Sequence, residues 1–574
     1  MSAFTVDGLQ EPAPGPEGRA GPGPGPQTSA EADTGTGTET GAETGAGVAP
    51  DAGRLLAGGA AGPAALRPLL GTVVGALSRG ALERGGPLPP GGPEAVAERV
   101  REALGAVLPE RGVGASEALD VLVGAVARGA ADPAEPLCAA HLHCPPLAVA
   151  AAADLAASAL NPSLDSWDQA PAASEVELLV CRALARLVFP QSGPEGSGEA
   201  AAGAGPDALV TAGGTEANQL AVLLAREGVG AGGCSDRVRL VCGSNAHHSV
   251  HRAAWLLGVE PPLVVPTPRG VLDPAALETA LDDLSARADG SGARAVPLVV
   301  ATAGTTDTGA VDPLPRLAEV AHRHGARLHV DAAYGGPLLF SAALRGRLAG
   351  VELADSVTFD LHKLGWQPVA AGFLAVPRGS ALRALDHRAD YLNADDDIEA
   401  GLPDLLGRSL RTTRRPDVLK VAVALRALGR AGMARLVERT CAAAVELAER
   451  VARDERFELY ARPAISTVVF RPAGGGDALV ARVRRLLLER GQVVLGRAAL
   501  EGRLWWKVTL LNPAVRGSDL AALLKLVAEA ASEAAAQTAA QTAAQTAAQT
   551  ARAEAAGAEA WREATGPVCE GAGT

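Results

Sequence analysis

The chain has little lysine, few aromatic residues and no long apolar run. Four of its 574 residues are lysine, and 3% are aromatic. Chemistry that needs a primary amine therefore has four candidates: Lys363, Lys420, Lys507 and Lys525. No stretch of about 18 or more apolar residues is present, and no basic N-terminal segment precedes an apolar one. We therefore expect no membrane span and no membrane partner.

The cysteine pattern and the net charge narrow the class of protein further. Seven cysteines are scattered without a CxxC pair. An odd number without paired spacing argues against a disulfide framework and fits a reducing compartment, so we expect a cytoplasmic location. The formal charge of −13 disfavours a nucleic-acid partner, because an acidic surface repels polyanions. With 48% apolar and 20% charged residues, most of the chain has globular composition.

Low-complexity sequence stands at both ends. Residues 1–50 are rich in Gly, Pro, Thr, Ala and Glu, and we expect a disordered tail because they offer little apolar surface to bury. Near the other end AAQT occurs four times from Ala535 to Thr550. We expect residues 533–574 to be a second low-complexity tail that forms at most a frayed helix. Residues 51–165 predict a helical N-terminal segment.

The middle of the chain alternates between two kinds of segment. Between Ala208 and Pro377, short β-branched runs are mostly separated by helical stretches. Apolar strands that alternate with helices predict an α/β fold with a mainly parallel sheet, in a large domain over residues 166–400. Asp273 and Asp312, each followed by proline, predict two helix caps. Residues 401–532 predict a smaller α+β domain, with helices from Pro416 and Met433 and strands near 466–470 and 504–511.

A glycine-rich turn opens the alternating region. The sequence T-A-G-G-T-E-A-N at 211–218 follows a strand and begins a helix. Glycines let a ligand approach the backbone, and the free N–H groups at a helix start attract an anion such as phosphate. A plain strand-to-helix connection is the alternative. The turn matches neither GxxxxGK[ST] nor GxGxxG, which argues against a nucleotide.

Two predicted strands end on residues that suit a ligand site. Asp331 closes an apolar run at the end where open α/β sheets bind ligands, and a buried carboxylate needs a cationic partner. Capping of the next turn is the alternative. Lys363 follows the strand over 355–360 in an apolar setting that favours a Schiff-base nucleophile. A lysine at a surface turn is the alternative there.

A histidine-rich segment completes the set. His247 begins a predicted helix, and its flat ring could stack on an aromatic cofactor. His247 and His251 stand four residues apart and could instead share a metal or form a polar helix face, but the Glu of HExxH is missing and we predict no metal. A phosphate-binding turn, an Asp for a pyridine nitrogen, a Lys for an aldehyde and a flat ring partner together describe pyridoxal phosphate (PLP).

The order of these motifs resembles the group II PLP-dependent amino acid decarboxylases, most closely the L-2,4-diaminobutyrate decarboxylase type. The likeness covers residues 140–420. It rests on the segments HLHCPP (141–146), NPSLDSWDQ (161–169), TAGGTEAN (211–218), NAHHSVHRAA (245–254), AGTT (303–306), HVDAAYGG (329–336), DLHKLGWQP (360–368) and TTRR (412–415).

The resemblance implies a fold, an assembly and a set of site residues. The fold would be the type I, aspartate-aminotransferase-like fold of PLP-dependent transferases. The assembly would be a homodimer with active sites at the subunit boundary. Lys363 would bind PLP covalently, Asp331 would pair with its ring nitrogen, and His247 would stack on the ring and take part in catalysis. The other expected cofactor contacts are Gly214, Thr215, Thr306, Ala333 and His362.

The chain departs from the aromatic amino acid decarboxylases at two places. Asp360 stands where those enzymes carry an Asn that contacts the phosphate, so we expect its carboxylate to turn toward a backbone N–H or toward His362. Their proton-donating loop tyrosine has no counterpart in residues 393–411. The proton donor is therefore open, and His247 is one candidate.

The predicted reaction is decarboxylation of a diamino acid to a diamine and carbon dioxide. L-2,4-diaminobutyrate is the first expectation, with lysine or ornithine next. His143 and Tyr391 are expected substrate contacts, and the acidic run at 395–399 is either a recognition loop for the distal ammonium or a solvated loop. One rival reading is an aldehyde-forming or other carbon–carbon lyase. Another is a non-catalytic scaffold.

Overall fold

The computed structural model describes residues 55–190, 205–230, 237–286, 295–386, 396, 399–402, 404–564 and 566. These residues belong to one unit, Gly53–Thr574. The division into a large domain over 166–400 and a small one over 401–532 therefore stays a prediction. The predicted tail over residues 1–50 lies outside the described residues.

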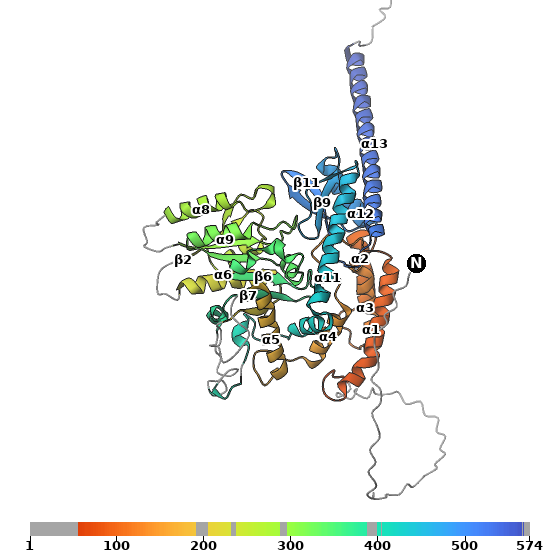
Figure 1. Cartoon of the computed structure of the whole chain (residues 1–574). Coiled ribbons are helices and arrows are strands. Elements are labelled where there is room, and N and C mark those ends of the chain that lie inside the picture. The colour runs from red at the N-terminus through yellow and green to blue at the C-terminus, as the bar shows by residue number, and fades with distance from the viewer. Residues whose placement is uncertain are drawn as a thin grey trace, which may run out of the picture. The chain divides into compact units, whose positions relative to one another are not determined.

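The centre of the described chain is a seven-stranded sheet in the order β1-β7-β6-β5-β4-β2-β3 (Figure 1). Strand β7 runs antiparallel to β1 and β6, and the other pairings are parallel. The mainly parallel sheet was predicted and is confirmed. Its strands are β1 (Asp207–Thr211), β2 (Arg237–Gly243), β3 (Leu263–Val265), β4 (Ala295–Thr302), β5 (Arg327–Asp331), β6 (Ser356–Asp360) and β7 (Gly372–Val376).

Helices cover both faces of this sheet, because alternate residues of each strand point to opposite faces. On β4, Val299 and Ala301 pack in one core cluster, whereas Leu298 and Val300 pack in another. The first face is covered by α5 (Pro171–Val188), α8 (Pro274–Ala286), α9 (Leu314–Arg323) and the first half of α11 (Val418–Arg453). The second is covered by α6 (Gly214–Gly230) and α7 (Ser249–Leu256).

A four-stranded sheet in the order β10-β11-β9-β8 forms a second core within the described residues. The last part of α11, from Ala444 to Val451, packs on it, and the same helix has a positive φ of 62° at Gly429. The elements are β8 (Phe457–Leu459), β9 (Thr467–Pro472), β10 (Gly496–Leu500), β11 (Arg503–Thr509), α12 (Asp477–Glu489) and α13 (Gly517–Ala564). Strands β8 and β10 were not predicted.

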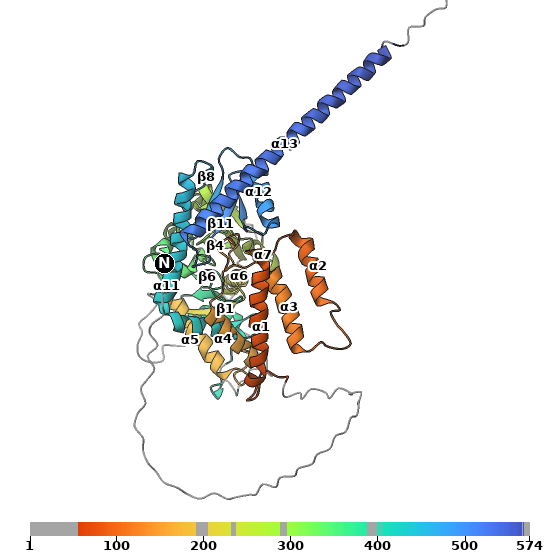
Figure 2. The same cartoon turned by 90° about the vertical axis from the view of Figure 1, so that its right-hand side faces the viewer.

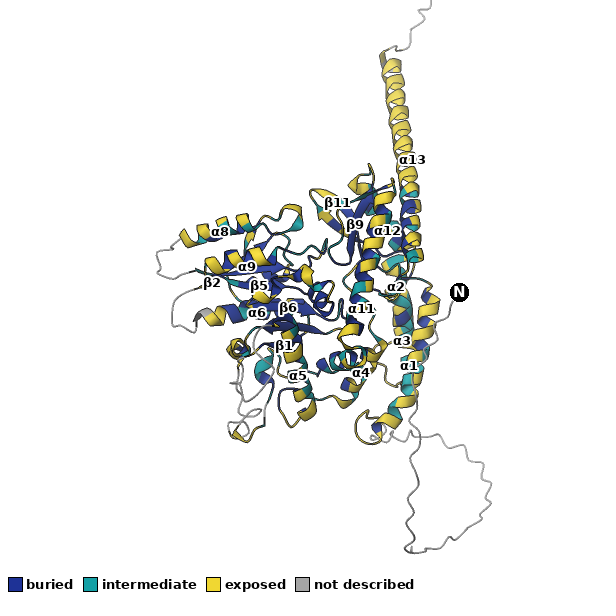
Figure 3. Ribbon diagram, viewed as in Figure 1, coloured by how far each residue is buried: buried dark blue, intermediate teal, exposed yellow. Residues whose placement is uncertain are grey.

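Helices dominate the N-terminal part of the described chain, as predicted. They are α1 (Gly62–Arg84), α2 (Gly92–Leu104), α3 (Ala115–Gly129) and α4 (Ala148–Leu160). The AAQT repeat continues α13 as an exposed helix from Ala535 (Figures 2 and 3). In each repeat the Thr hydroxyl donates to the carbonyl four residues earlier. No helix among the described residues is both long and apolar enough to span a membrane.

One predicted helix cap is correct and the other is wrong. Asp273 caps α8, since its Oδ1 accepts the N–H of Ala275 at 3.0 Å. The carboxylate of Asp312 instead accepts the backbone N–H groups of Leu272 and Thr302, at 2.8 and 2.7 Å, and α9 begins two residues later. Asp312 thus joins a loop to the end of β4, because those buried N–H groups need an acceptor.

Candidate active site

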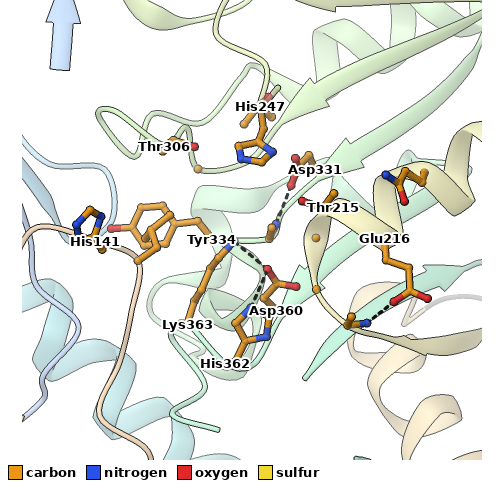
Figure 4. Close-up of a pocket in the computed structure, with 18 of the residues that line it drawn as sticks. His141, Thr215, Glu216, His247, Thr306, Asp331, Tyr334, Asp360, His362 and Lys363 are labelled. Atoms are coloured by element: carbon orange, nitrogen blue, oxygen red, sulfur yellow. Dashed lines mark hydrogen bonds and ion pairs between the residues drawn. The ribbon is translucent and has the colours of Figure 1, made fainter. Parts of the chain in front are cut away.

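A cavity of about 570 Å³ lies at the carboxyl ends of the parallel strands (Figure 4). Thr302 of β4, Asp331 of β5 and Asp360 of β6 end their strands at its wall. The start of α6 lies on the same wall. Open α/β sheets bind ligands at this edge, and the four polar segments singled out in the sequence converge there.

The glycine turn before α6 has no room for a side chain. A Cβ on Gly214 would lie 2.8 Å from the Cβ of Ala333 and 3.3 Å from Oδ2 of Asp360. Gly214 and Thr215 are the first residues of α6, where backbone N–H groups have no partner within the helix, and both line the cavity. Glu216 turns away from these groups, because its Oε2 accepts the N–H of Ala212 at 2.5 Å. The turn can therefore hold an anion through N–H groups.

Asp331 is a buried carboxylate that faces the cavity. It is 5% exposed, its Oδ1 accepts the N–H of Ala333 at 3.1 Å, and its Oδ2 accepts the side-chain N–H of Asn218 at 2.7 Å. A buried carboxylate in this setting can hold a cationic ring nitrogen, because the cation would supply the opposite charge that burial demands.

His247 lines the same cavity as a neutral ring. Burial lowers the pKa of its imidazole, and the nearby His248 and Lys363 act in the same direction against Asp331. Its Nδ1 lies 2.9 Å from Oγ of Ser249 and accepts the N–H of Ser249 at 3.3 Å. An unprotonated Nδ1 leaves the ring proton on Nε2.

Lys363 lies beside Asp360 in the cavity. Its Nζ is 2.8 Å from Oδ2 of Asp360, whose side chain is 1% exposed and whose two oxygens have no partner of hydrogen-bond geometry. The short contact is therefore an ion pair with poor angles. His362 Nε2 is 3.6 Å from the same oxygen, and burial lowers the pKa of this histidine. Asp360 thus turns toward His362, as expected, and toward Lys363, which was not expected.

The four lysines have distinct surroundings. Lys420 is fully buried and paired with Asp154 at 3.0 Å, whereas Lys525 is exposed. Lys507 also lines the cavity, but its Nζ donates to the carbonyl of Thr306 at 3.1 Å. Lys363 and Lys507 are therefore the two lysines that could react with a ligand there.

The remaining predicted residues divide into three groups. Thr306, Ala333 and His362 line the cavity. His143 is not on its wall, whereas His141, two residues earlier, is, and burial lowers the pKa of His141. Tyr391 and most of the acidic run at 395–399 lie outside the described residues.

Three groups were missed by sequence reasoning: Tyr334 and Lys507 on the cavity wall, and Asn218 behind it. Asn218 belongs to the glycine motif, but nothing in the motif showed its contact with Asp331. Tyr334 lines the cavity, yet its hydroxyl contacts Ser466 at 2.8 Å and Thr467 at 2.9 Å, and burial raises its pKa to about 12. Lys507 comes from β11, more than 140 residues beyond Lys363, so only the fold brings it here.

The wall of the cavity fits PLP. The turn at Gly214 leaves backbone space and free N–H groups for a phosphate, Asp331 offers a carboxylate, and Lys363 offers an amine. Two buried acceptors, the carboxylate of Asp360 and Oδ1 of Asn245, lack hydrogen-bond partners, which is unusual unless a ligand completes the site.

Comparison with known proteins defines the class. A profile of the pyridoxal-dependent decarboxylase conserved domain matches residues 124–473, more than half of the chain. The chain therefore belongs to the pyridoxal-dependent decarboxylase family. The predicted resemblance, the type I α/β fold, the PLP cofactor and the carboxy-lyase class are confirmed.

Two relatives show which kind of decarboxylase the chain is similar to. The chain is 37% identical over 432 residues to the L-2,4-diaminobutyrate decarboxylase of Rhizobium meliloti (strain 1021), covering 74% of this chain and 83% of that protein. It is 31% identical over 462 residues to the enzyme of that name from Acinetobacter baumannii, covering 75% and 87%.

A solved structure has the same fold. It is the glutamate decarboxylase domain of diaminobutyrate-pyruvate transaminase and L-2,4-diaminobutyrate decarboxylase from Vibrio parahaemolyticus, with a TM-score of 0.72 and 30% identity over 83% of this chain and 98% of that one. Oryza sativa TDC, solved with PLP and tryptamine, also has a TM-score of 0.72, at 26% identity over 82% and 98%.

Proposed function

We propose that this chain decarboxylates a diamino acid, with L-2,4-diaminobutyrate as its first substrate and lysine or ornithine next. The products would be the diamine and carbon dioxide. The names of the relatives from Rhizobium meliloti and Acinetobacter baumannii support this substrate. The observation that carries the proposal is one cavity lined by Lys363, Asp331, His247 and the turn at Gly214.

Each of these residues has a role that its surroundings support. Lys363 would hold the cofactor covalently, and Asp331 would keep its ring nitrogen protonated. His247 and Ala333 would pack on the ring, and the N–H groups of Gly214 and Thr215 would bind the phosphate. PLP, when bound, supplies a ring that accepts the electron pair released when the bond between Cα and the carboxylate breaks.

The further cavity contacts complete the binding site. Thr306 and His362 would lie beside the cofactor, since both belong to the cavity wall. Asp360 would serve as the counter-ion of Lys363 whenever the amine of this lysine is free and protonated. Its short distance to Nζ, and the absence of a hydrogen bond to either of its oxygens from the described residues, support that role. Released as an ammonium in a buried site, Lys363 needs such a partner.

We propose that His247 returns the proton to Cα. Its Nε2 carries the ring proton, because Nδ1 accepts the N–H of Ser249. Another group of the cavity wall that could donate a proton, the hydroxyl of Tyr334, is held by Ser466 and Thr467 and has a raised pKa. His247→Gln should therefore change the ratio of amine to aldehyde product or slow product formation by about 10²-fold, within the range for loss of an acid–base group.

A substrate panel tests the function. Purified protein with PLP is given L-2,4-diaminobutyrate, ornithine, lysine, glutamate and aromatic amino acids, and carbon dioxide release is measured. The expected result is the highest kcat/KM for diaminobutyrate, with one amine formed per carbon dioxide. A preference for glutamate or an aromatic substrate would contradict the diamino acid. Aldehyde with ammonia in place of amine would favour the aldehyde-forming lyase.

We propose that the protein is a homodimer. Of the twenty-five exposed large hydrophobic side chains among the described residues, thirteen lie between Leu55 and Val126, around α1, α2 and α3. Helix α2 has no buried residue. So much exposed apolar surface in one segment is typical of an interface. Leu108, which is 94% exposed, offers a test: Leu108→Glu should shift the protein toward monomer in sedimentation, whereas an unchanged dimer would place the interface elsewhere.

We propose a cytoplasmic location for the enzyme. Five of the cysteines, Cys138, Cys144, Cys181, Cys242 and Cys441, lie among the described residues as free thiols. Free thiols persist in a reducing compartment. Fractionation of expressing cells tests this, and enzyme found in an exported fraction would contradict it.

A further inference from the structure

A chain of buried hydrogen bonds runs behind the wall of the cavity. It begins at Ser356, passes through His329 to Asn218, and there divides toward Asp331 and Ser249. The distances are 2.8 Å from Ser356 Oγ to His329 Nδ1 and 3.0 Å from His329 Nε2 to Asn218 Oδ1. From Asn218 Nδ2 they are 2.7 Å to Asp331 Oδ2 and 2.9 Å to Ser249 Oγ. In this chain of hydrogen bonds, the residue that donates to Asp331 is Asn218, which is 1% exposed.

The donors and acceptors of this chain are fixed by its members. The side-chain oxygen of Asn218 only accepts, so Nε2 of His329 must donate to it, and Nδ1 of His329 then accepts from the hydroxyl of Ser356. Burial lowers the pKa of His329 to about 4, so the ring is neutral and carries one proton. That proton orients the amide of Asn218, whose two N–H groups are left to donate to Asp331 and Ser249.

We propose that Asn218 is a positioning residue that keeps the carboxylate of Asp331 ionised and directed at the cofactor. The proposal rests on the role given above to Asp331. An amide that donates to a buried carboxylate stabilises the ionised form, because a hydrogen bond to a charged group is stronger than one to a neutral group. His329 takes part indirectly by holding the amide in the donating orientation.

Loss of the amide has a consequence that depends on pH. In Asn218→Ala, Oδ2 of Asp331 loses the hydrogen bond that it accepts among the described residues, whereas Oδ1 keeps the N–H of Ala333. A buried carboxylate with fewer donors is protonated more readily, and a neutral acid does not hold a cationic ring nitrogen. Cofactor affinity should therefore fall most at low pH and recover as the pH rises. A loss caused only by damaged packing would be similar at every pH.

The test measures the dissociation constant of PLP for the full-length protein, by absorbance titration of the cofactor-depleted enzyme between pH 6 and 8.5. Asn218→Ala is compared with wild type at each pH. We expect about tenfold weaker binding at pH 6 and less than about threefold at pH 8.5, the size of effect that loss of one charged hydrogen bond gives.

Two variants serve as references. Asp331→Asn should weaken binding at every pH, because the carboxylate is absent. Asn512→Ala removes another buried amide, which donates to the carbonyl of Ala134 at 2.6 Å outside the cavity, and should leave PLP affinity unchanged. It controls for loss of a buried asparagine as such.

The outcomes separate this inference from the proposed function. The role of Asn218 is overturned if Asn218→Ala loses PLP affinity equally at pH 6 and 8.5, or loses none at either pH. Weaker binding in Asp331→Asn would still show in that case that the carboxylate binds the cofactor. Unchanged affinity in Asp331→Asn would overturn both, since the carboxylate would then have no part in binding. A pH-dependent loss in Asn218→Ala alone, beside a uniform loss in Asp331→Asn, is the expected result.

Discussion

Among the regions of the described chain that bury charged side chains, the cavity differs from the contact between α5 and the segment before α11. In the second region Arg414 and Glu177 form a two-pronged ion pair at 2.6 and 2.5 Å, and both side chains are at most 2% exposed. In the cavity Asp360 is equally buried, but its ion pair with Lys363 has poor geometry and its oxygens have no hydrogen bonds.

This difference distinguishes buried charges that stabilise the fold from buried charges that serve a ligand site. Where a buried charge serves only the fold, its partners are supplied by the protein, because an unpaired buried charge is costly. Arg415, whose side chain is 32% exposed near the same contact, is also given partners by the protein: although partial burial lowers its pKa, the carboxylates of Asp417 and Asp154 raise it overall. In the cavity the protein compensates only part of the free-energy cost of burying charge. Burial there also lowers the pKa of His247 and His362. A ligand that forms the missing hydrogen bonds and ion pairs would gain binding energy, because these side chains are incompletely paired in the protein alone.

The largest expected effect comes from exchanging two ion-paired lysines for alanine, Lys363 on the cavity wall and Lys420 in the core beside α4. Lys363→Ala should lower the decarboxylation rate by about three orders of magnitude or more, as loss of a covalent catalytic group does. Lys420→Ala should lower stability but leave the cofactor covalently bound, since the ion-pair partners of Lys420 among the described residues, Asp154 and Asp417, do not line the cavity. Carbon dioxide release and urea unfolding measure the two effects. Equal loss of activity in both variants would contradict the distinction between a lysine that acts on the cofactor and a lysine that stabilises the fold.

The second effect concerns the ion pair between Arg414 and Glu177. Arg414→Met leaves a buried carboxylate without a partner and should cost about 3–5 kcal/mol of unfolding free energy. The double variant Glu177→Leu with Arg414→Met removes both charges and should recover most of that loss. Urea unfolding at one fixed protein concentration measures both. A double variant as unstable as the single one would show that packing, rather than the charge, sets the cost.

The third effect is a pH dependence that arises behind the cavity. Burial lowers the pKa of His329 to about 4, below the ~6.5 of an unfolded histidine, so the unfolded chain binds more protons in between. This contribution to stability is present above pH 6.5 and is lost as the pH falls toward 4. Between pH 7 and 5, wild type should lose about 2 kcal/mol more unfolding free energy than His329→Gln. Parallel stability curves for the two proteins would contradict a neutral His329.

The smallest effect is expected from an exposed pair. Lys525 lies 3.8 Å from Glu529 on α13, and both side chains are more than half exposed. Solvent screens such pairs, so Lys525→Ala should change the unfolding free energy by less than about 0.5 kcal/mol and leave activity intact. Thermal unfolding and carbon dioxide release are the measurements. A loss comparable to that of Lys420→Ala would show that burial is not what distinguishes the lysines.

The sheet was predictable because its strands are buried on both faces. The runs that contain β1 to β7 are rich in β-branched and other apolar residues, which sets them apart from the helical stretches between them. Strands β8 and β10 escaped notice because three or five residues of mixed polarity give no periodic signal. Asp312 was misjudged for another reason. An Asp-Pro pair fits a helix cap, but the distant N–H groups of Leu272 and Thr302 compete for its carboxylate.

The candidate site was predictable only where a motif is local. The residues around Lys363, Asp331, His247 and Gly214 carry their signal in a few neighbouring positions, and the structure brings them to one cavity. Lys507 reaches the cavity from β11, and Asn218 meets Asp331 across 113 residues of sequence. Such contacts follow from how the elements pack, which no short segment encodes. His141 and His143 differ by two positions, and only the local backbone decides which one faces the cavity.

The central claim is that the amine of Lys363 holds the cofactor, and one measurement tests it directly. The enzyme loaded with PLP is reduced with borohydride and digested, and the peptide that carries the cofactor is sequenced by mass spectrometry. We predict a single modified peptide that contains Lys363. Modification of Lys507, the other lysine of the cavity, or recovery of all the cofactor in unbound form would contradict the account.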